Sequence, residues 1–176
     1  MIKKFEEFVK MNESNIFRRM DEIGMTIEKF LKSKGENLNV YCFVDCSGSV
    51  EKDFVYNFLT RIFKYNSNKV CVYGFGAQLS EPYVSDNESL KDDINVASSI
   101  TWNFISSQKV GVYTENFINV ANEINNIKQE DKDAVIFIFG DGHWDDPKVG
   151  IHCLNTDLDM EYYLDDICVL TYGYGK

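Results

Sequence analysis

The sequence contains no run of apolar residues long enough to cross a membrane. A membrane-spanning helix needs roughly eighteen or more consecutive apolar residues, and the 176 residues of the chain include no such stretch. Residues 1–7 carry two lysines and two glutamates and lack the apolar core of a secretion signal. We therefore expect a cytoplasmic protein with no membrane partner.

Basic charge is also scarce. The chain has 28 acidic and 18 basic residues, which gives a formal net charge of −10. No basic patch with interleaved aromatic residues offsets this charge, so the phosphate backbone of a nucleic acid would be repelled. We expect no nucleic-acid partner.

Cysteine and histidine do not form a zinc pattern. The five cysteines include no Cys-x-x-Cys pair and no Cys/His cluster of zinc spacing, and His143 and His152 are interpreted as solvated or packed side chains. Three cysteines lie inside apolar runs and are expected to be small buried hydrophobes: Cys42, Cys71 and Cys168. Cys46 follows an aspartate, and nearby carboxylates would raise the pKa of its thiol, which argues against a reactive thiolate.

Apolar runs of strand length alternate with helical patterns along the rest of the chain. A hydrophobic content of 44% over this length suits one α/β domain with a substantial core. We predict an open, mostly parallel, Rossmann-like sheet of order 3-2-1-4-5, with one antiparallel edge strand and helices on both faces. The expected strands cover residues 38–44, 69–75, 82–84, 134–139 and 167–172, and the expected helices cover 51–65, 88–96 and 117–127.

The first part of the chain is predicted to be helical. Apolar residues recur at helical spacing over residues 3–33, where Gly24 could interrupt the helix. The chain is therefore divided into an N-terminal helical segment packed on the core, residues 1–33, and an α/β domain, residues 34–176. The alternative is that the N-terminal segment is an arm that binds a partner.

The sequence Asp-Cys-Ser-Gly-Ser at residues 45–49 follows the first buried strand directly. Asp45, Ser47 and Ser49 alternate with other residues, so a tightly curved loop can turn three oxygens toward one point, and Gly48 relieves the strain of that curve. Oxygen donors alone favour Mg²⁺, Mn²⁺ or Ca²⁺ over zinc. The alternative is an Asp-Ser turn that only caps the next helix.

Two later residues repeat this placement. Asp141 follows the predicted strand 134–139, as Asp45 follows the first strand, and parallel strands bring such ends to one edge of the sheet. Thr114 stands just before the predicted helix 117–127. Thr114 is a candidate ligand or, alternatively, an N-cap of that helix.

Together these motifs resemble the von Willebrand factor type A domain and its metal-ion-dependent adhesion site, whose pattern is Asp-x-Ser-x-Ser, then Thr, then Asp-Gly. The resemblance runs from about Leu38 to the C-terminus, and it implies that five residues hold the ion: Asp45, Ser47, Ser49, Thr114 and Asp141. Family members usually continue with a further strand and helix, so a variant trimmed at the C-terminus is expected. The N-terminal helical segment would then cover the sheet face left by the missing helix.

The resemblance implies a metal-dependent protein-binding module and not an enzyme. A bound Mg²⁺, Mn²⁺ or Ca²⁺ would capture a Glu or Asp of a partner protein, such as an AAA+ ATPase assembly. One alternative is a structural subunit whose site is empty. Another is a phosphohydrolase with Asp45 as nucleophile, but position 47 is Ser where such enzymes have a second acid. The sequence also contains neither a Gly-x-x-x-x-Gly-Lys loop nor a Gly-x-Ser-x-Gly elbow.

Overall fold

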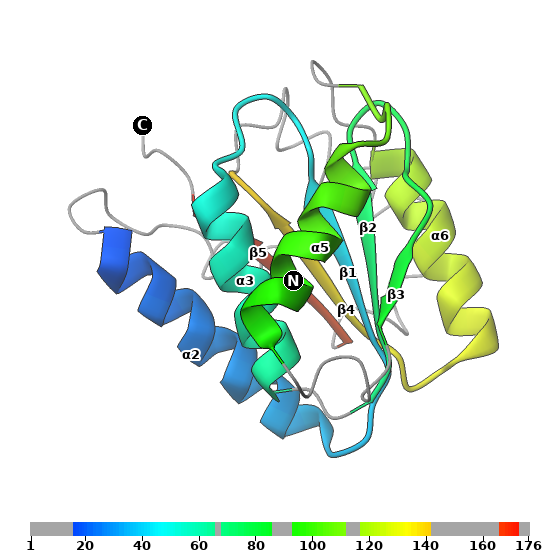
Figure 1. Cartoon of the computed structure of the whole chain (residues 1–176). Coiled ribbons are helices and arrows are strands. Elements are labelled where there is room, and N and C mark those ends of the chain that lie inside the picture. The colour runs from blue at the N-terminus through cyan, green and yellow to red at the C-terminus, as the bar shows by residue number, and fades with distance from the viewer. Residues whose placement is uncertain (1–15, 66–67, 86–92, 112–116, 142–165, 173–176) are drawn as a thin grey trace.

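The strands of the computed structural model form one five-stranded sheet of order β3-β2-β1-β4-β5 (Figure 1). The structure describes residues 16–65, 68–85, 93–111, 117–141 and 166–172. All neighbouring strands are parallel except β2 and β3, which are antiparallel. The predicted fold and strand order are confirmed. The strands are β1 (Val40–Asp45), β2 (Val70–Phe75), β3 (Tyr83–Ser85), β4 (Val135–Gly140) and β5 (Ile167–Thr171).

Helices cover both faces of this sheet, as the sequence predicts. They are α2 (Ile16–Lys34), α3 (Lys52–Tyr65), α5 (Ile94–Ser106) and α6 (Phe117–Glu130). Figure 1 shows α2, α3 and α5 on the near face and α6 on the far face, and the buried residues divide into two clusters in the same way. Among the described helices, none combines the length and the apolar character needed to cross a membrane.

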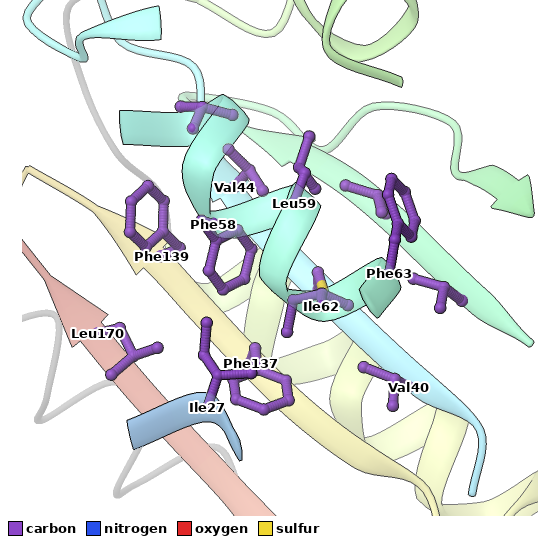
Figure 2. Packing of buried hydrophobic residues seen from close by; sticks show 14 of the residues in the cluster. Ile27, Val40, Val44, Phe58, Leu59, Ile62, Phe63, Phe137, Phe139 and Leu170 are labelled. Atoms are coloured by element: carbon purple, nitrogen blue, oxygen red, sulfur yellow. The ribbon is translucent and has the colours of Figure 1, made fainter. Parts of the chain in front are cut away.

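The larger cluster lies between α2, α3, α5 and the sheet. Figure 2 shows Phe58 of α3 directed onto β4, where its ring stacks on Phe139 with 4.4 Å between centroids. Ile27 of α2 lies beside Phe137 in the same view. These side chains explain why β4 is apolar on both faces: α6 covers one face and the near-side helices cover the other.

The described part of the N-terminal segment is α2, and Gly24 does not interrupt it. Gly24 is buried where α2 meets α3, and a β-carbon there would lie 2.9 Å from Nε of Arg61. The glycine therefore leaves room for the Arg61 side chain between the two helices. Ile23 and Leu31 of α2 join the buried cluster of the sheet, while residues 1–15 lie outside the described residues.

Helix α5 extends beyond the end of the helix that the sequence predicts. The expected helix covers residues 88–96, but the observed helix runs from Ile94 to Ser106, and residues 86–92 lie outside the described residues. The carboxylate of Asp93 caps the helix by accepting hydrogen bonds from the backbone N–H groups of Asn95 and Val96. The prediction is therefore confirmed for residues 94–96 and wrong for Asp93, which was placed inside the helix although it is the N-cap residue; for residues 88–92 it stays a prediction.

A buried lysine ties three elements together at the amino edge of the sheet. Lys128 of α6 is 2% exposed, and its amine donates to the carbonyls of Lys132 and Ala134 and to Oδ2 of Asp166, over 2.7 to 2.8 Å. Lys34 at the end of α2 approaches the other oxygen of Asp166 at 3.1 Å. The carboxylate just before β5 thus joins α2 and α6 across the sheet.

Candidate functional site

Asp45 and the loop after it form one hydrogen-bonded turn. Asp45 is the last residue of β1 and is 0% exposed, and its Oδ1 accepts a hydrogen bond of 2.8 Å from the backbone N–H of Ser47. The Ser47 and Ser49 hydroxyl oxygens lie 3.2 Å apart. This turn brings the two hydroxyls together beside the buried carboxylate. Three of the predicted site residues are therefore neighbours in space.

Asp141 occupies the equivalent place on the neighbouring strand. It follows Gly140, the last residue of β4, and is also 0% exposed. β1 and β4 are paired in parallel with Val44 opposite Phe139. Asp45 comes one residue after Val44 in β1, and Asp141 comes two residues after Phe139 of β4. Both carboxylates therefore stand at the same edge of the sheet, on adjacent strands.

Thr114 lies outside the described residues, as do His143 and His152. The described residues before Thr114 are held to the loop that follows β2, since the backbone N–H of Gln78 donates to the Val110 carbonyl at 2.8 Å. After it, the ring of Phe117 lies 5.4 Å from that of Phe75, the last residue of β2. The role of Thr114 as a ligand stays a prediction.

Tyr172 is a residue of this region that the sequence analysis did not single out. It is 1% exposed and directly follows β5, and its hydroxyl accepts a 2.6 Å hydrogen bond from the backbone N–H of Glu51. Its ring stacks on Phe54 with 4.1 Å between centroids, and its own N–H donates to the Gly140 carbonyl. Tyr172 thus joins the ends of β4 and β5 to the start of α3, which follows the Asp45 loop. The signal for it was its place at a strand end.

The charges of both aspartates act on this tyrosine. Burial raises the pKa of the Tyr172 phenol; the hydrogen bond from the Glu51 backbone lowers it, but negative charge on Asp141, then on Glu51 and then on Asp45 raises it further. The phenol therefore stays protonated at any physiological pH. The pKa of the phenol depends on the carboxylates of both Asp45 and Asp141, as we expect if the two lie in one region beside Tyr172.

Removing the Tyr172 hydroxyl is expected to weaken the fold beside the site. In Tyr172→Phe the backbone N–H of Glu51, the residue before α3, loses its partly buried acceptor, so the free energy of unfolding should fall by about 1 kcal/mol in urea denaturation. Tyr56→Phe is the matched control, because the Tyr56 hydroxyl bonds Lys52 and, at 3.3 Å, Ser99 in a partly exposed position. Equal stability of Tyr172→Phe and the natural chain would contradict the role given to this hydroxyl.

Cys46, inside the loop, is not a reactive thiol. Burial raises its pKa to about 12, and the charge of Asp45 adds to the shift. The sequence analysis expected the direction but gave the carboxylate as the cause, whereas burial is the larger one. Gly74 makes room for this side chain, since a β-carbon at Gly74 would lie 2.8 Å from the Cys46 sulfur.

The donors present at this edge suit a hard cation. Asp45, Ser47, Ser49 and Asp141 offer oxygen only, which is the chemistry of Mg²⁺, Mn²⁺ and Ca²⁺ sites. Within the described ranges, no group of three or more His, Cys, Asp and Glu side chains is placed to hold a metal ion. A site here would therefore depend on the serine hydroxyls as well as on the two carboxylates.

Compared with known families and curated proteins, the chain matches none. Its function is therefore inferred from its own residues and their geometry. The two features that bear on function are the buried carboxylates at the ends of β1 and β4 and the serine pair beside the first of them.

Proposed function

We propose that the chain is a metal-dependent protein-binding module, with a site like the metal-ion-dependent adhesion site of von Willebrand factor type A domains. The observation that carries the proposal is the burial of Asp45 and Asp141, each 0% exposed, at the ends of adjacent parallel strands. Keeping two carboxylates out of water is costly unless positive charge compensates them. A divalent cation at this edge would supply that charge.

The residues that would hold the cation are Asp45, Ser47, Ser49, Thr114 and Asp141. The hydroxyls of the serines and of Thr114 are neutral ligands, so two carboxylates would carry all the negative charge that the protein contributes. A cation held in this way can also accept a carboxylate from outside the chain. The proposed partner therefore presents a Glu or Asp side chain, and the family resemblance suggests an assembly containing an AAA+ ATPase.

The burial of Asp45 also bears on the choice between binding and catalysis. A phosphohydrolase would need this carboxylate to reach a phosphorus atom, and no part of Asp45 is exposed. Its Oδ1 is engaged by the backbone of its own loop. Both facts favour a binding role over a nucleophilic one.

A pair of short peptides that differ only in Glu and Gln tests this function directly. With Mn²⁺ as the bound ion, water-proton relaxation reports how many water molecules remain on the metal. The Glu peptide is expected to lower the relaxation enhancement by displacing water, and the Gln peptide is expected to leave it unchanged.

Two variants locate the effect within the site. Ser47→Ala and Thr114→Ala should weaken the response to the Glu peptide while the circular dichroism spectrum stays that of the natural chain, because both hydroxyls are predicted to lie at the edge of the sheet and not in its core. Equal responses to the Glu and Gln peptides would contradict capture of an acidic residue. Failure of the natural chain to bind Mn²⁺ at all would favour the structural subunit with an empty site.

A further inference from the structure

A groove of about 390 Å³ lies on the far face of the sheet, between two turns of α6 and the strands β1, β2 and β3. Of the described helices, α6 alone lies on this face, and the next described helix after β3, α5, lies on the near face (Figure 1). The volume of the groove is within the range of small-molecule sites. None of the residues that line it belongs to the proposed metal site.

The strands supply the floor of the groove. It consists of aromatic and small apolar side chains, namely Tyr41 of β1, Cys71 and Tyr73 of β2, and Val84 of β3. The ring of Tyr73 is fixed because it stacks on Phe43 with 5.0 Å between centroids, whereas Val84 is 53% exposed. The floor therefore offers a surface on which methylene groups of a ligand can be removed from water.

Two glutamates of α6 line the wall of the groove. Glu123 and Glu130 are seven residues apart, so they share one face of the helix and are separated by about 10 Å along its axis. The hydroxyl of Tyr73 donates a hydrogen bond of 2.8 Å to Oε1 of Glu123, which fixes that carboxylate. Within the part of the chain that the structure describes, neither glutamate forms an ion pair.

The charge in the groove is negative although one lysine lines it. The amine of Lys69, an exposed residue, lies 5.9 Å from the centre of the Tyr41 ring, so this ring already faces an ammonium group. Burial is the largest cause that raises the pKa of Tyr41 to about 12, and the charges of nearby acidic residues, Glu123 and Glu130 among them, raise it further. One lysine therefore does not compensate the carboxylates around the groove.

This arrangement of charge and apolar surface excludes several kinds of ligand. Both glutamates would repel an anion. A metal ion needs its ligands within one coordination shell, whereas these carboxylates stand two helical turns apart. An amine with one ammonium group would meet only one of the two. The ligand that matches the groove is a linear chain with ammonium groups about 10 Å apart and methylene groups between them.

We infer that the groove binds a linear aliphatic polyamine, with one ammonium group at Glu123, a second at Glu130, and the methylene chain between them on the floor of the groove. The face of the Tyr41 ring adds cation–π attraction. A single ion pair at a partly exposed carboxylate contributes little. Binding therefore depends on engaging both carboxylates at once, because the second contact forms within the complex.

Isothermal titration with two diamines of equal charge and different length tests the inference. The probes are α,ω-diaminooctane, which is long enough to reach both glutamates, and α,ω-diaminobutane, which is not. The protein is first freed of divalent cations on a chelating resin, so the result does not depend on the proposed metal site. At about 0.15 M salt we expect one saturable site for diaminooctane and an affinity for diaminobutane that is at least about fivefold lower.

Three variants separate this groove from the general attraction of an acidic protein for amines. Glu123→Gln and Glu130→Gln should each weaken diaminooctane binding about fivefold or more, and Glu130 is exposed, so its variant serves if Glu123→Gln does not fold. Asp53→Asn removes the same charge from an exposed position on α3, on the near face, and should bind as the natural chain does. No saturable binding of diaminooctane, equal affinity for the two diamines, or equal weakening in all three variants would overturn the inference.

Discussion

Lys128→Met is expected to lower the free energy of unfolding by about 3 kcal/mol, one of the two largest effects anticipated for a single substitution. The amine is 2% exposed and donates to two backbone carbonyls and to the Asp166 carboxylate. Methionine fills a similar volume but donates nothing, so these three acceptors lose a donor inside the protein. The lost hydrogen bonds are those that join the ends of α2 and α6 to the start of β5.

Urea denaturation of Lys128→Met, followed by circular dichroism, measures this effect. Lys32→Met is the control: Lys32 pairs with Glu28 at 2.6 Å, but its side chain is 74% exposed. That pair lies in water, so its loss should leave the unfolding midpoint unchanged within error. If both variants unfold at the midpoint of the natural chain, Lys128 does not hold these elements together.

The same ion pair predicts a pH dependence. Partial burial alone would raise the pKa of Asp166, but hydrogen bonds from Lys128 and Lys34 outweigh it and hold the pKa below its ordinary value of 3.8. A carboxyl with a lowered pKa contributes stability above its ordinary value and loses it as the pH falls through the lowered one. The stability difference between the natural chain and Asp166→Asn should therefore be constant above about pH 5 and shrink in acid below the ordinary pKa.

The second large effect concerns metal affinity. Asp141→Asn is expected to weaken Mn²⁺ binding at least about 100-fold, because one of only two carboxylates proposed to hold the ion becomes neutral. Asparagine keeps the size of the side chain at a position with no exposed surface. The change therefore removes charge and leaves the packing at the end of β4 as it is.

A control for Asp141→Asn lies beyond the other end of β4. Asp133 precedes β4, is exposed, and stands at the opposite edge of the sheet from Asp141. Asp133→Asn removes the same charge, so the two variants separate a local ligand from the general attraction of an acidic protein for cations. Isothermal titration should give the natural affinity for Asp133→Asn. Equal weakening in both variants would mean that Mn²⁺ binds diffusely.

The sheet was predictable because its four parallel strands are predominantly apolar and buried. Runs such as residues 134–139 fix where the buried parallel strands lie, and right-handed crossovers then leave few possible strand orders. The same reasoning placed Asp45 and Asp141 at one edge, since each follows such a run. Helix α5 was harder to place because residues 94–106 show apolar residues on both the buried and the exposed side, which blurs the helical period.

Residues whose role depends on distant partners could not be found from the pattern. Lysine is usually exposed, and the carboxylate that pairs with Lys128 lies 38 positions later in the chain. Tyr172 likewise acts through Glu51, which is 121 positions away. In both cases the contact is set by how elements meet in space, and no local spacing encodes it.

Mn²⁺ titration of the natural chain and of Asp45→Ala, by isothermal calorimetry under identical conditions, tests the central claim most directly. We predict that the natural chain binds one ion in a saturable step and that this step is lost in Asp45→Ala, while the two circular dichroism spectra agree. Equal heats for the two proteins would contradict the account, because the carboxylate at the end of β1 would then take no part in holding an ion.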